Sequence, residues 1–218
     1  MHDLDLTETL VSAIASRQAR VGIIGLGYVG LPLTTAFASK GFSVLAFDID
    51  QRKVEMLECG KSYIRQISDE HIRDMRDSGR FAVTADFSRL SEVDVILICV
   101  PTPLTAQREP DMSFVEDTTK LIASHLRRGQ LVVLESTTYP GTSRTLVRPL
   151  LEASGLRSGR DFLLAYSPER EDPGNLEYRT STIPKVVAGD GPGGGARGAD
   201  VILRGGVARG TGVDARYC

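Results

Sequence analysis

The chain has 218 residues, of which 41% are hydrophobic and 25% are charged. These proportions are typical of a soluble globular protein and exclude a disordered or fibrous chain. Its 26 basic and 28 acidic residues give a formal net charge of −2, so the charge balance favours neither nucleic acid nor an anionic membrane as a partner.

No segment of the sequence indicates membrane insertion, secretion or metal binding. The longest apolar run, residues 95–100, has the length of a strand and falls far short of the roughly 20 residues that span a bilayer. The first residues lack the basic and apolar regions of a signal peptide. Cys59, Cys99 and Cys218 show no pattern, so neither a disulfide framework nor a metal site is expected. We therefore expect a cytoplasmic protein without a bound metal.

The hydrophobic pattern predicts an N-terminal helix followed by alternating strands and helices. Apolar residues at near-helical spacing over 3–18 indicate an amphipathic helix, so residues 1–19 are a separate N-terminal element. Strands are predicted at 20–25, 42–47, 81–84, 93–100, 131–135 and 162–166, and helices at 31–40, 51–58, 68–78, 115–127 and 143–153. Such alternation is typical of βαβ units. Residues 20–188 are therefore predicted to form a Rossmann-type, doubly wound α/β fold, in which helices cover both faces of a mainly parallel sheet.

Residues 189–218 differ in composition from the rest of the chain. They contain ten of the 22 glycines and four arginines, with no lysine and no sustained apolar periodicity. Such low-complexity sequence is typical of flexible segments, so we expect a disordered Gly/Arg-rich tail. The alternative is a natural tail that contacts nucleic acid, but four arginines against three aspartates give a net charge of only +1.

A glycine-rich turn follows the first predicted strand directly. Its residues match the pattern G-x-G-x-x-G and are Gly25, Leu26, Gly27, Tyr28, Val29 and Gly30. The first glycine permits a sharp turn, the second lets backbone amides approach a pyrophosphate, and the third lets helix and strand pack closely. A tight connection without a ligand is the alternative interpretation. The following helix N-terminus attracts phosphates, so the context favours a dinucleotide site.

Asp48 ends the second predicted strand, 18 residues after Gly30. A carboxylate at this position accepts the hydroxyls of an adenosine ribose and repels the 2′-phosphate of NADP. The alternative role for Asp48 is to cap the next helix, for which Asp50 is better placed. Arg52 and Lys53 lie close by in sequence, so charge alone does not exclude NADP. Together with the glycine-rich turn, Asp48 predicts a dinucleotide site that prefers NAD.

Two later loops are predicted to face the same site. Residues 100–104 (VPTPL) and 135–142 (ESTTYPGT) each follow a predicted strand, and ligands of open parallel sheets lie beyond the carboxyl ends of the strands. Ordinary turns rich in Pro, Ser and Thr are the alternative. The charged segment 166–175 follows another strand, where a glutamate is able to accept a proton. A solvated charged turn is the alternative there.

Four motifs, in order and with matching spacing, resemble those of the UDP-glucose/GDP-mannose dehydrogenase family. They are VGIIGLGYVGLP (21–32), CVPTP (99–103), ESTTYPGT (135–142) and SPER (167–170). The variants STTYPGT and SPEREDPGN, with Tyr63, Ile64 and the segment 108–114, are most similar to the UDP-N-acetylhexosamine 6-dehydrogenases, particularly those that act on UDP-N-acetylglucosamine. The resemblance runs from residue 20 to residue 189.

The resemblance implies a two-step oxidation of the sugar C6 alcohol to a carboxylate, which consumes one water and reduces two NAD⁺. It implies that the glycine-rich turn and Asp48 hold NAD. The residues that match positions contacting NAD or ordering the catalytic water are Lys53, Pro101, Thr102 and Thr137. Glu169 matches the catalytic glutamate, and Thr137 is the second predicted catalytic residue. The residues predicted to border a UDP-N-acetylhexosamine substrate are Glu169, Arg170, Glu171 and Asp172, together with the loop 63–67.

The family also uses a lysine that stabilises an oxyanion and a nucleophilic cysteine in a Gly-rich loop. The sequence contains neither motif, and the central domain with its dimer-forming helix and the UDP-binding domain are absent from it. We therefore expect a truncated chain that is inactive by itself and that gives no basis for oligomerisation through that helix.

Three interpretations of the chain remain open beside the leading one. Translation of GC-rich DNA in a shifted frame yields sequence rich in Gly, Ala and Arg, so we interpret residues 189–218 as a frameshifted tail. A stand-alone NAD-binding module without catalysis is an alternative function. A dehydrogenase of the 3-hydroxyacid type is another, and the SPER motif argues against it.

Overall fold

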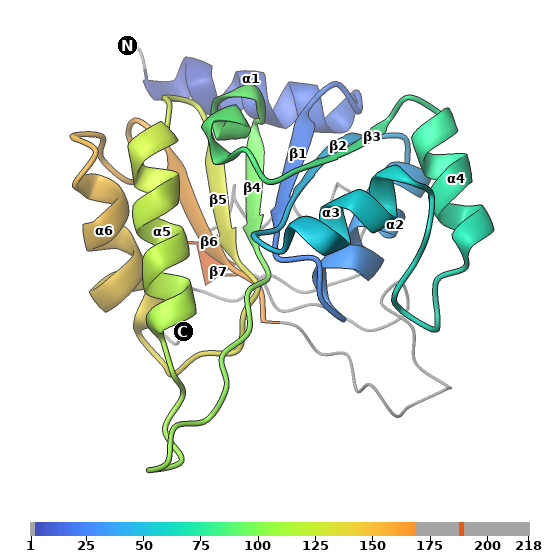
Figure 1. The fold of residues 1–218 in the computed structure, drawn as a ribbon. Coiled ribbons are helices and arrows are strands. Elements are labelled where there is room, and N and C mark those ends of the chain that lie inside the picture. Colours follow the sequence, from blue (N-terminus) through green and yellow to red (C-terminus); the bar gives the residue numbers. More distant parts are fainter. Residues whose placement is uncertain (1–2, 169–187, 190–218) are drawn as a thin grey trace.

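The computed structural model describes residues 3–168 and 188–189, and a seven-stranded sheet organises them (Figure 1). The strands are β1 (Arg20–Ile24), β2 (Ser43–Phe47), β3 (Phe81–Thr84), β4 (Val95–Ile98), β5 (Leu131–Leu134), β6 (Leu163–Tyr166) and β7 (Ala188–Gly189). Their order is β3-β2-β1-β4-β5-β6-β7, with β1 to β6 parallel and β7 antiparallel to β6. This order is that of a doubly wound sheet. Successive strands are added on one side of β1 as far as β3, and on the other side from β4 onward, so the order reverses between β1 and β4.

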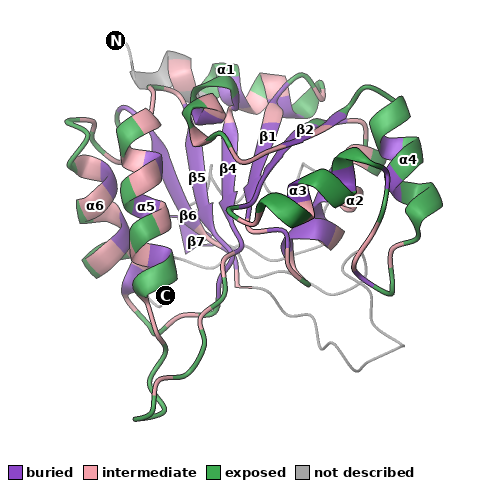
Figure 2. Ribbon diagram, viewed as in Figure 1, coloured by how far each residue is buried: buried purple, intermediate pink, exposed green. Residues whose placement is uncertain are grey.

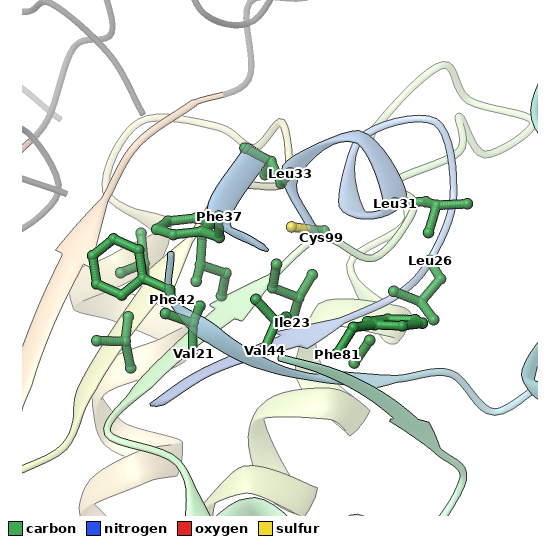
Figure 3. Close-up of a cluster of buried hydrophobic side chains, with 14 of the residues drawn as sticks. Val21, Ile23, Leu26, Leu31, Leu33, Phe37, Phe42, Val44, Phe81 and Cys99 are labelled. Carbon is green, nitrogen blue, oxygen red and sulfur yellow. The ribbon is translucent and has the colours of Figure 1, made fainter. Parts of the chain in front are cut away.

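Helices cover both faces of the sheet, and two separate hydrophobic clusters lie between the layers (Figure 2). The helices are α1 (Asp3–Ala15), α2 (Gly30–Ser39), α3 (Gln51–Glu58), α4 (Asp69–Asp77), α5 (Ser113–His125) and α6 (Arg148–Glu152). Side chains of α2, α3 and α4 belong to one cluster. Figure 3 shows the part of it that surrounds β1 and α2. Side chains of α5 and α6 belong to the other. The predicted Rossmann-type fold is thus confirmed.

Alternation along each strand explains why the sequence shows continuous apolar runs. In β1, Val21 and Ile23 belong to the cluster on the α2 side, while Ile24 belongs to the cluster on the α5 side. Successive side chains of a strand point to opposite faces, so a strand buried on both faces needs apolar residues at every position. The central strand β4 is buried at all four of its residues.

Several boundaries differ from the sequence-based expectations, and two short elements were not expected. The predicted helix over 3–18 ends at Ala15, because Arg17 adopts a left-handed conformation with φ 63°. The region 143–153 begins with a π-helical turn, Ser143–Val147, before α6. A 3₁₀-helix at Phe87–Glu92 and the strand β7 were not predicted. β7 includes Gly189, the first residue of the predicted tail, and residues 190–218 lie outside the described residues.

Helix α1 lies along the edge of the sheet formed by the amino ends of the strands (Figure 1). Its residues Leu10 and Ile14 are buried in the cluster on the α2 side. None of the helices in the described part of the chain has the length and apolar character that crossing a bilayer requires.

Polar side chains close this amino edge of the sheet. Gln130 is fully buried before β5, and its amide donates to the carbonyls of Leu90 (2.9 Å) and Val93 (2.8 Å). The Gln130 side-chain oxygen accepts from the Arg127 N–H at 2.7 Å. The Arg127 guanidinium in turn donates to the Asp94 carboxylate at 2.6 Å. These bonds pair polar groups at the amino edge, and the Arg127 guanidinium is a second donor to the Val93 carbonyl at 2.8 Å.

Candidate dinucleotide-binding site

The glycine-rich turn after β1 needs glycine at two positions for different steric reasons. Gly25 has φ +90°, and a Cβ there would lie 2.7 Å from the carbonyl oxygen of Cys99. A Cβ on Gly30 would collide with the carbonyl oxygen of Gly25. At Gly27, in contrast, no described atom outside residues 26–28 lies within 4 Å of the position a Cβ would take. The turn is therefore packed tightly against β4 and α2 at its ends and open at its middle.

Asp48 follows β2 and ties the turn to the neighbouring strand. Its side chain is buried, with the residue only 4% exposed. Oδ2 accepts from the Leu26 N–H at 2.8 Å and from Lys53 Nζ at 3.0 Å, and Oδ1 accepts from the Asp50 N–H at 2.9 Å. Asp50 caps α3 by accepting from the Arg52 N–H at 3.0 Å, as predicted. The carboxylate of Asp48 is thus held in one orientation at the carboxyl edge of the sheet.

Tyr63, in the loop between α3 and α4, reaches the same turn from another direction. Its hydroxyl donates to the Leu26 carbonyl at 2.7 Å. Lys53 Nζ lies 5.9 Å from the centroid of the Tyr63 ring, within the range of a cation–π contact. Burial raises the pKa of Tyr63, and the charges of Asp48 and Asp50 raise it further. The structure thus places the Tyr63 hydroxyl on the glycine-rich turn, and the role beside the substrate that the family resemblance implies for the 63–67 loop stays a prediction.

A cavity of about 750 Å³ opens in front of the turn, at the carboxyl edge where the strand order reverses. It brings together most of the residues predicted to bind the cofactor, which are Gly25, Leu26, Gly27, Tyr28, Val29, Asp48, Lys53, Pro101, Thr102 and Thr137. Gly30 does not line the cavity, because it is buried under the turn as the first residue of α2. Residues that are far apart in sequence therefore form one concave site.

The cavity is also lined by residues that the sequence analysis did not identify as site residues. They are Ile49, Phe87 and four residues from the first turns of α5, namely Phe114, Asp117, Thr118 and Leu121. Phe114 is 40% exposed and Ile49 is 79% exposed, so both present apolar surface at the cavity. The α5 residues recur at intervals of three or four along the helix, so they share one face. The sequence contains this spacing and an apolar residue, Phe114, in the first turn of the helix, and these two features could have indicated the lining residues.

The two loops predicted to face the site both contribute to it, but only in part. Val100, Pro101 and Thr102 line the cavity, as do Glu135, Ser136 and Thr137. The Ser136 hydroxyl donates to the Val100 carbonyl at 2.7 Å and so joins the two loops. Residues 138–142 instead line a separate hollow of about 150 Å³.

The predicted residues Glu169, Arg170, Glu171 and Asp172 lie outside the described residues. Ser167 and Pro168 are the described residues that follow β6. Ser167 is buried, and its N–H donates to the Leu134 carbonyl at 2.9 Å. The exit of β6 therefore adjoins the end of β5, from which Thr137 extends.

The sheet order, the glycine turn leading into α2 and the acidic residue after β2 together define a dinucleotide-binding α/β domain. Residues 19–194 match the family model described as "UDP-glucose/GDP-mannose dehydrogenase family, NAD binding domain". The chain belongs to this family and carries its NAD-binding domain.

Individual relatives agree with the family match. The chain is 36% identical over 177 residues to a UDP-N-acetyl-D-glucosamine 6-dehydrogenase from Pseudomonas aeruginosa, and 37% identical over 171 residues to a UDP-N-acetyl-D-mannosamine dehydrogenase from Pyrococcus horikoshii. These alignments cover 81% and 78% of this chain but only 41% of each relative. The chain thus spans less than half the length of the curated relatives it matches.

Solved structures show the same partial coverage. The UDP-D-ManNAc dehydrogenase structure from Pyrococcus horikoshii superimposes with a TM-score of 0.79 at 31% identity, covering 88% of this chain and 46% of that one. A ternary complex of GDP-mannose dehydrogenase from Pseudomonas aeruginosa gives a TM-score of 0.80 at 27% identity, covering 89% of this chain and 46% of that one. The similarity therefore places this fold within one part of larger dehydrogenases.

Proposed function

We propose that the cavity binds NAD⁺, with the pyrophosphate at the glycine-rich turn and the N-terminus of α2. The open middle of the turn carries this proposal, because no described atom outside residues 26–28 lies within 4 Å of where a Cβ on Gly27 would be. Backbone without a side chain lets a phosphate approach the amide groups closely. The N-terminus of α2 adds a positive dipole end, while the N–H groups of Leu31 and Leu33 already donate to the carbonyls of Gly27 and Val29.

Asp48 is proposed to hold the adenosine ribose and to favour NAD⁺ over NADP⁺. A carboxylate oxygen has two acceptor sites, and the bond from Asp50 takes one of those on Oδ1. The other is able to accept a ribose hydroxyl. A 2′-phosphate at the same place would bring a second negative charge against a buried carboxylate. Lys53 is paired with Asp48 at 3.0 Å, so its charge is already largely compensated.

For the complete dehydrogenase we propose an NAD-dependent oxidation of a UDP-N-acetylhexosamine at C6, in the cytoplasm. The relatives named UDP-N-acetyl-D-glucosamine 6-dehydrogenase and UDP-N-acetyl-D-mannosamine dehydrogenase support this substrate class. NAD⁺ supplies the hydride acceptor when it is bound. Thr137, which lines the cavity, is proposed to order the catalytic water, and Glu169 to accept a proton. Arg170, Glu171 and Asp172 are proposed to border the sugar.

We further propose that the 218-residue chain by itself binds the cofactor without oxidising the sugar. The family resemblance assigns the oxyanion-stabilising lysine and the nucleophilic cysteine to a region that this sequence does not match. Among the described cysteines, Cys59 is exposed after α3 and Cys99 is buried in the wall behind the turn. Loss of one oxyanion-stabilising group typically costs a factor of about 10²–10³ in rate. No useful turnover is therefore expected from this chain.

Isothermal titration calorimetry with NAD⁺ and NADP⁺ tests the binding proposal. The wild type is expected to bind NAD⁺ more tightly than NADP⁺. Gly27→Ala is expected to weaken NAD⁺ binding about tenfold, since its methyl group occupies the space the phosphate needs. Asp48→Asn is expected to weaken NAD⁺ binding and to reduce the difference between the affinities for NAD⁺ and NADP⁺.

A matched charge removal provides the control. Asp77→Asn neutralises an exposed carboxylate at the end of α4, away from the cavity, and should leave both affinities unchanged. If the wild type fails to bind NAD⁺, or if Gly27→Ala and Asp48→Asn bind it like the wild type, the site assignment is wrong.

Formation of NADH, followed by absorbance with UDP-N-acetylglucosamine, tests the proposal on catalysis. The wild type and Glu169→Gln should both give no rate above background at saturating NAD⁺. Robust formation of two NADH per sugar that depends on Glu169 would show that this chain contains a complete catalytic site.

A further inference from the structure

Both polar groups of one buried residue in the glycine-rich turn are held by side chains from distant segments. Leu26 is fully buried, and its N–H donates to Asp48 at 2.8 Å. Its carbonyl accepts from the Tyr63 hydroxyl at 2.7 Å. Asp48 lies 22 residues away along the chain and Tyr63 lies 37 residues away. The turn is therefore fixed by tertiary contacts as well as by its own sequence.

Tyr63 is itself held in place by a short, ordered turn before α4. The Ser62 N–H donates to Asp69 Oδ1 at 2.8 Å, and the Ser62 hydroxyl is 3.1 Å from the carbonyl oxygen of Ile64. Ile64 is buried at 5% exposure and belongs to the hydrophobic cluster on the α2 side. The neighbours of Tyr63 on both sides are thus fixed, so its hydroxyl is directed at Leu26 by the backbone that carries it.

The geometry of a peptide bond links this contact to the cavity. In a trans peptide unit the C=O and the following N–H point in opposite directions. Tyr63 holds the Leu26 carbonyl on the side away from the cavity, since Tyr63 does not line it whereas Leu26 and Gly27 do. The N–H of Gly27, in the same peptide unit, consequently points to the other side. Glycine has the widest backbone freedom of any residue, so an orientation at this position requires an external restraint.

We propose that Tyr63 is a positioning residue for cofactor binding: by donating to the Leu26 carbonyl, it holds the Leu26–Gly27 peptide so that the Gly27 N–H faces the pyrophosphate of the dinucleotide. This inference rests on the proposed function of the cavity. The pKa of Tyr63, raised by burial, keeps the phenol protonated and able to donate at neutral and mildly alkaline pH. The neighbouring Lys53, in contact with both Asp48 and the ring of Tyr63, connects the two restraints on Leu26.

Tyr63→Phe tests the proposal, because it removes only the hydroxyl. The probes are ADP-ribose and NAD⁺, which contain the pyrophosphate, and adenosine, which does not; calorimetry is used for the first two and competition for adenosine. We expect ADP-ribose and NAD⁺ to bind about fivefold more weakly, a change equivalent to about 1 kcal/mol, and adenosine to bind as it does to the wild type. A purely structural role would lower all three affinities together or none of them.

Thr119→Val is the matched control. It also removes a hydroxyl that donates to a carbonyl, that of Val115 at 2.6 Å, and it does so in a buried position of α5 that does not line the cavity. All three affinities should be unchanged. If Tyr63→Phe does not fold, Asp69→Ala removes the acceptor of the Ser62 N–H, loosens the turn that carries Tyr63 and should produce a smaller loss with the same selectivity.

Two results would overturn the proposal. One is equal binding of ADP-ribose by Tyr63→Phe and by the wild type, and the other is an equal loss for adenosine and ADP-ribose. Failure of the wild type to bind NAD⁺ is a different outcome, which would overturn the proposed function itself. In ¹⁵N-labelled wild type, the Gly27 amide signal should shift on addition of ADP-ribose and stay in place on addition of adenosine.

Discussion

Before the amino ends of β4 and β5, side chains bond to the backbone carbonyls of Leu90 and Val93, whereas the carboxyl ends of the same strands border a cavity of about 750 Å³. Gln130, Arg127 and Asp94 form one connected network at the amino edge. At the carboxyl edge, glycine backbone and loop residues face open space. The two edges belong to the same strands, but hydrogen bonds between side chains and backbone close the amino edge, whereas the carboxyl edge borders open space.

The difference indicates which polar groups stabilise the fold and which are available to a ligand. A buried polar group without a partner destabilises the protein by about 1–3 kcal/mol, so most such groups are paired within the structure. At the amino edge that pairing is internal and serves stability alone. At the carboxyl edge the middle of the turn presents backbone to the cavity, and Asp48 is paired yet retains capacity for another donor. We therefore expect substitutions at the two edges to separate stability from binding.

Gly30→Ala is expected to have the largest effect, because it disrupts the carboxyl edge from within. The added Cβ collides with the carbonyl oxygen of Gly25, a backbone atom that cannot move without reshaping the turn. We expect NAD⁺ affinity to fall at least a hundredfold and the free energy of unfolding to fall by about 2–3 kcal/mol. Calorimetry and urea unfolding measure the two losses. Ser39→Ala, at the other end of α2, is the control and should bind NAD⁺ like the wild type. Normal NAD⁺ binding by Gly30→Ala would show that the turn accommodates the added Cβ.

Gln130→Leu is expected to lower stability without changing binding. It removes the bonds to Leu90, Val93 and Arg127, while the Val93 carbonyl still accepts from the Arg127 guanidinium at 2.8 Å. We expect the free energy of unfolding to fall by about 2 kcal/mol. NAD⁺ affinity, measured under conditions in which the variant is fully folded, should equal that of the wild type. A clear loss of affinity would show that the two edges are coupled and would break the comparison.

Asp161→Asn should have the smallest effect on the free energy of unfolding, and this effect should depend on pH. The Arg160 side chain is the main cause that lowers the pKa of Asp161, with a further contribution from the Arg157 N–H at 2.9 Å. Because the pKa in the folded state lies below the value of about 3.9 in the unfolded state, the stabilisation is present above about pH 4 and is lost as the pH falls through the folded value. We expect the free energy of unfolding of the wild type to exceed that of Asp161→Asn by about 1 kcal/mol at pH 6.

Urea unfolding at pH 6 and pH 3 measures this pH dependence, and the difference between the two proteins should shrink at the lower pH. A difference that stays constant with pH would indicate that the Asp161 contribution does not come from its charge. NAD⁺ affinity at pH 6 should be the same in both proteins, since Asp161 lies outside the cavity.

The parts of the fold that depend on local signals could be predicted from the sequence. Asp50 caps α3 through the next residues in the chain, and the predicted helix 51–58 coincides with α3. The glycine-rich turn and Asp48 follow a spacing rule that reflects the βαβ unit itself. The parallel sheet follows from the alternation of strands and helices along the chain.

The parts that depend on tertiary contacts could not be predicted. The bond between Tyr63 and Leu26 joins residues 37 positions apart, and nothing near Tyr63 in sequence specifies its partner. Phe114 lines the cavity because α5 packs beside the strand ends, although the predicted helix began one residue after it, at 115. The two-residue strand β7 exists only through its pairing with β6. Each of these features requires the fold to be formed first.

The orientation of Asp48 before any ligand arrives has a thermodynamic consequence. Three donors already hold the carboxylate, so this side chain has little rotamer freedom left to lose when a ribose binds. Ordering a flexible side chain at an interface typically costs about 0.5–1.5 kcal/mol, and here that ordering takes place during folding. The loss of side-chain freedom at Asp48 should therefore contribute almost nothing to the entropy change when adenosine binds, and the site is preorganised for the ribose.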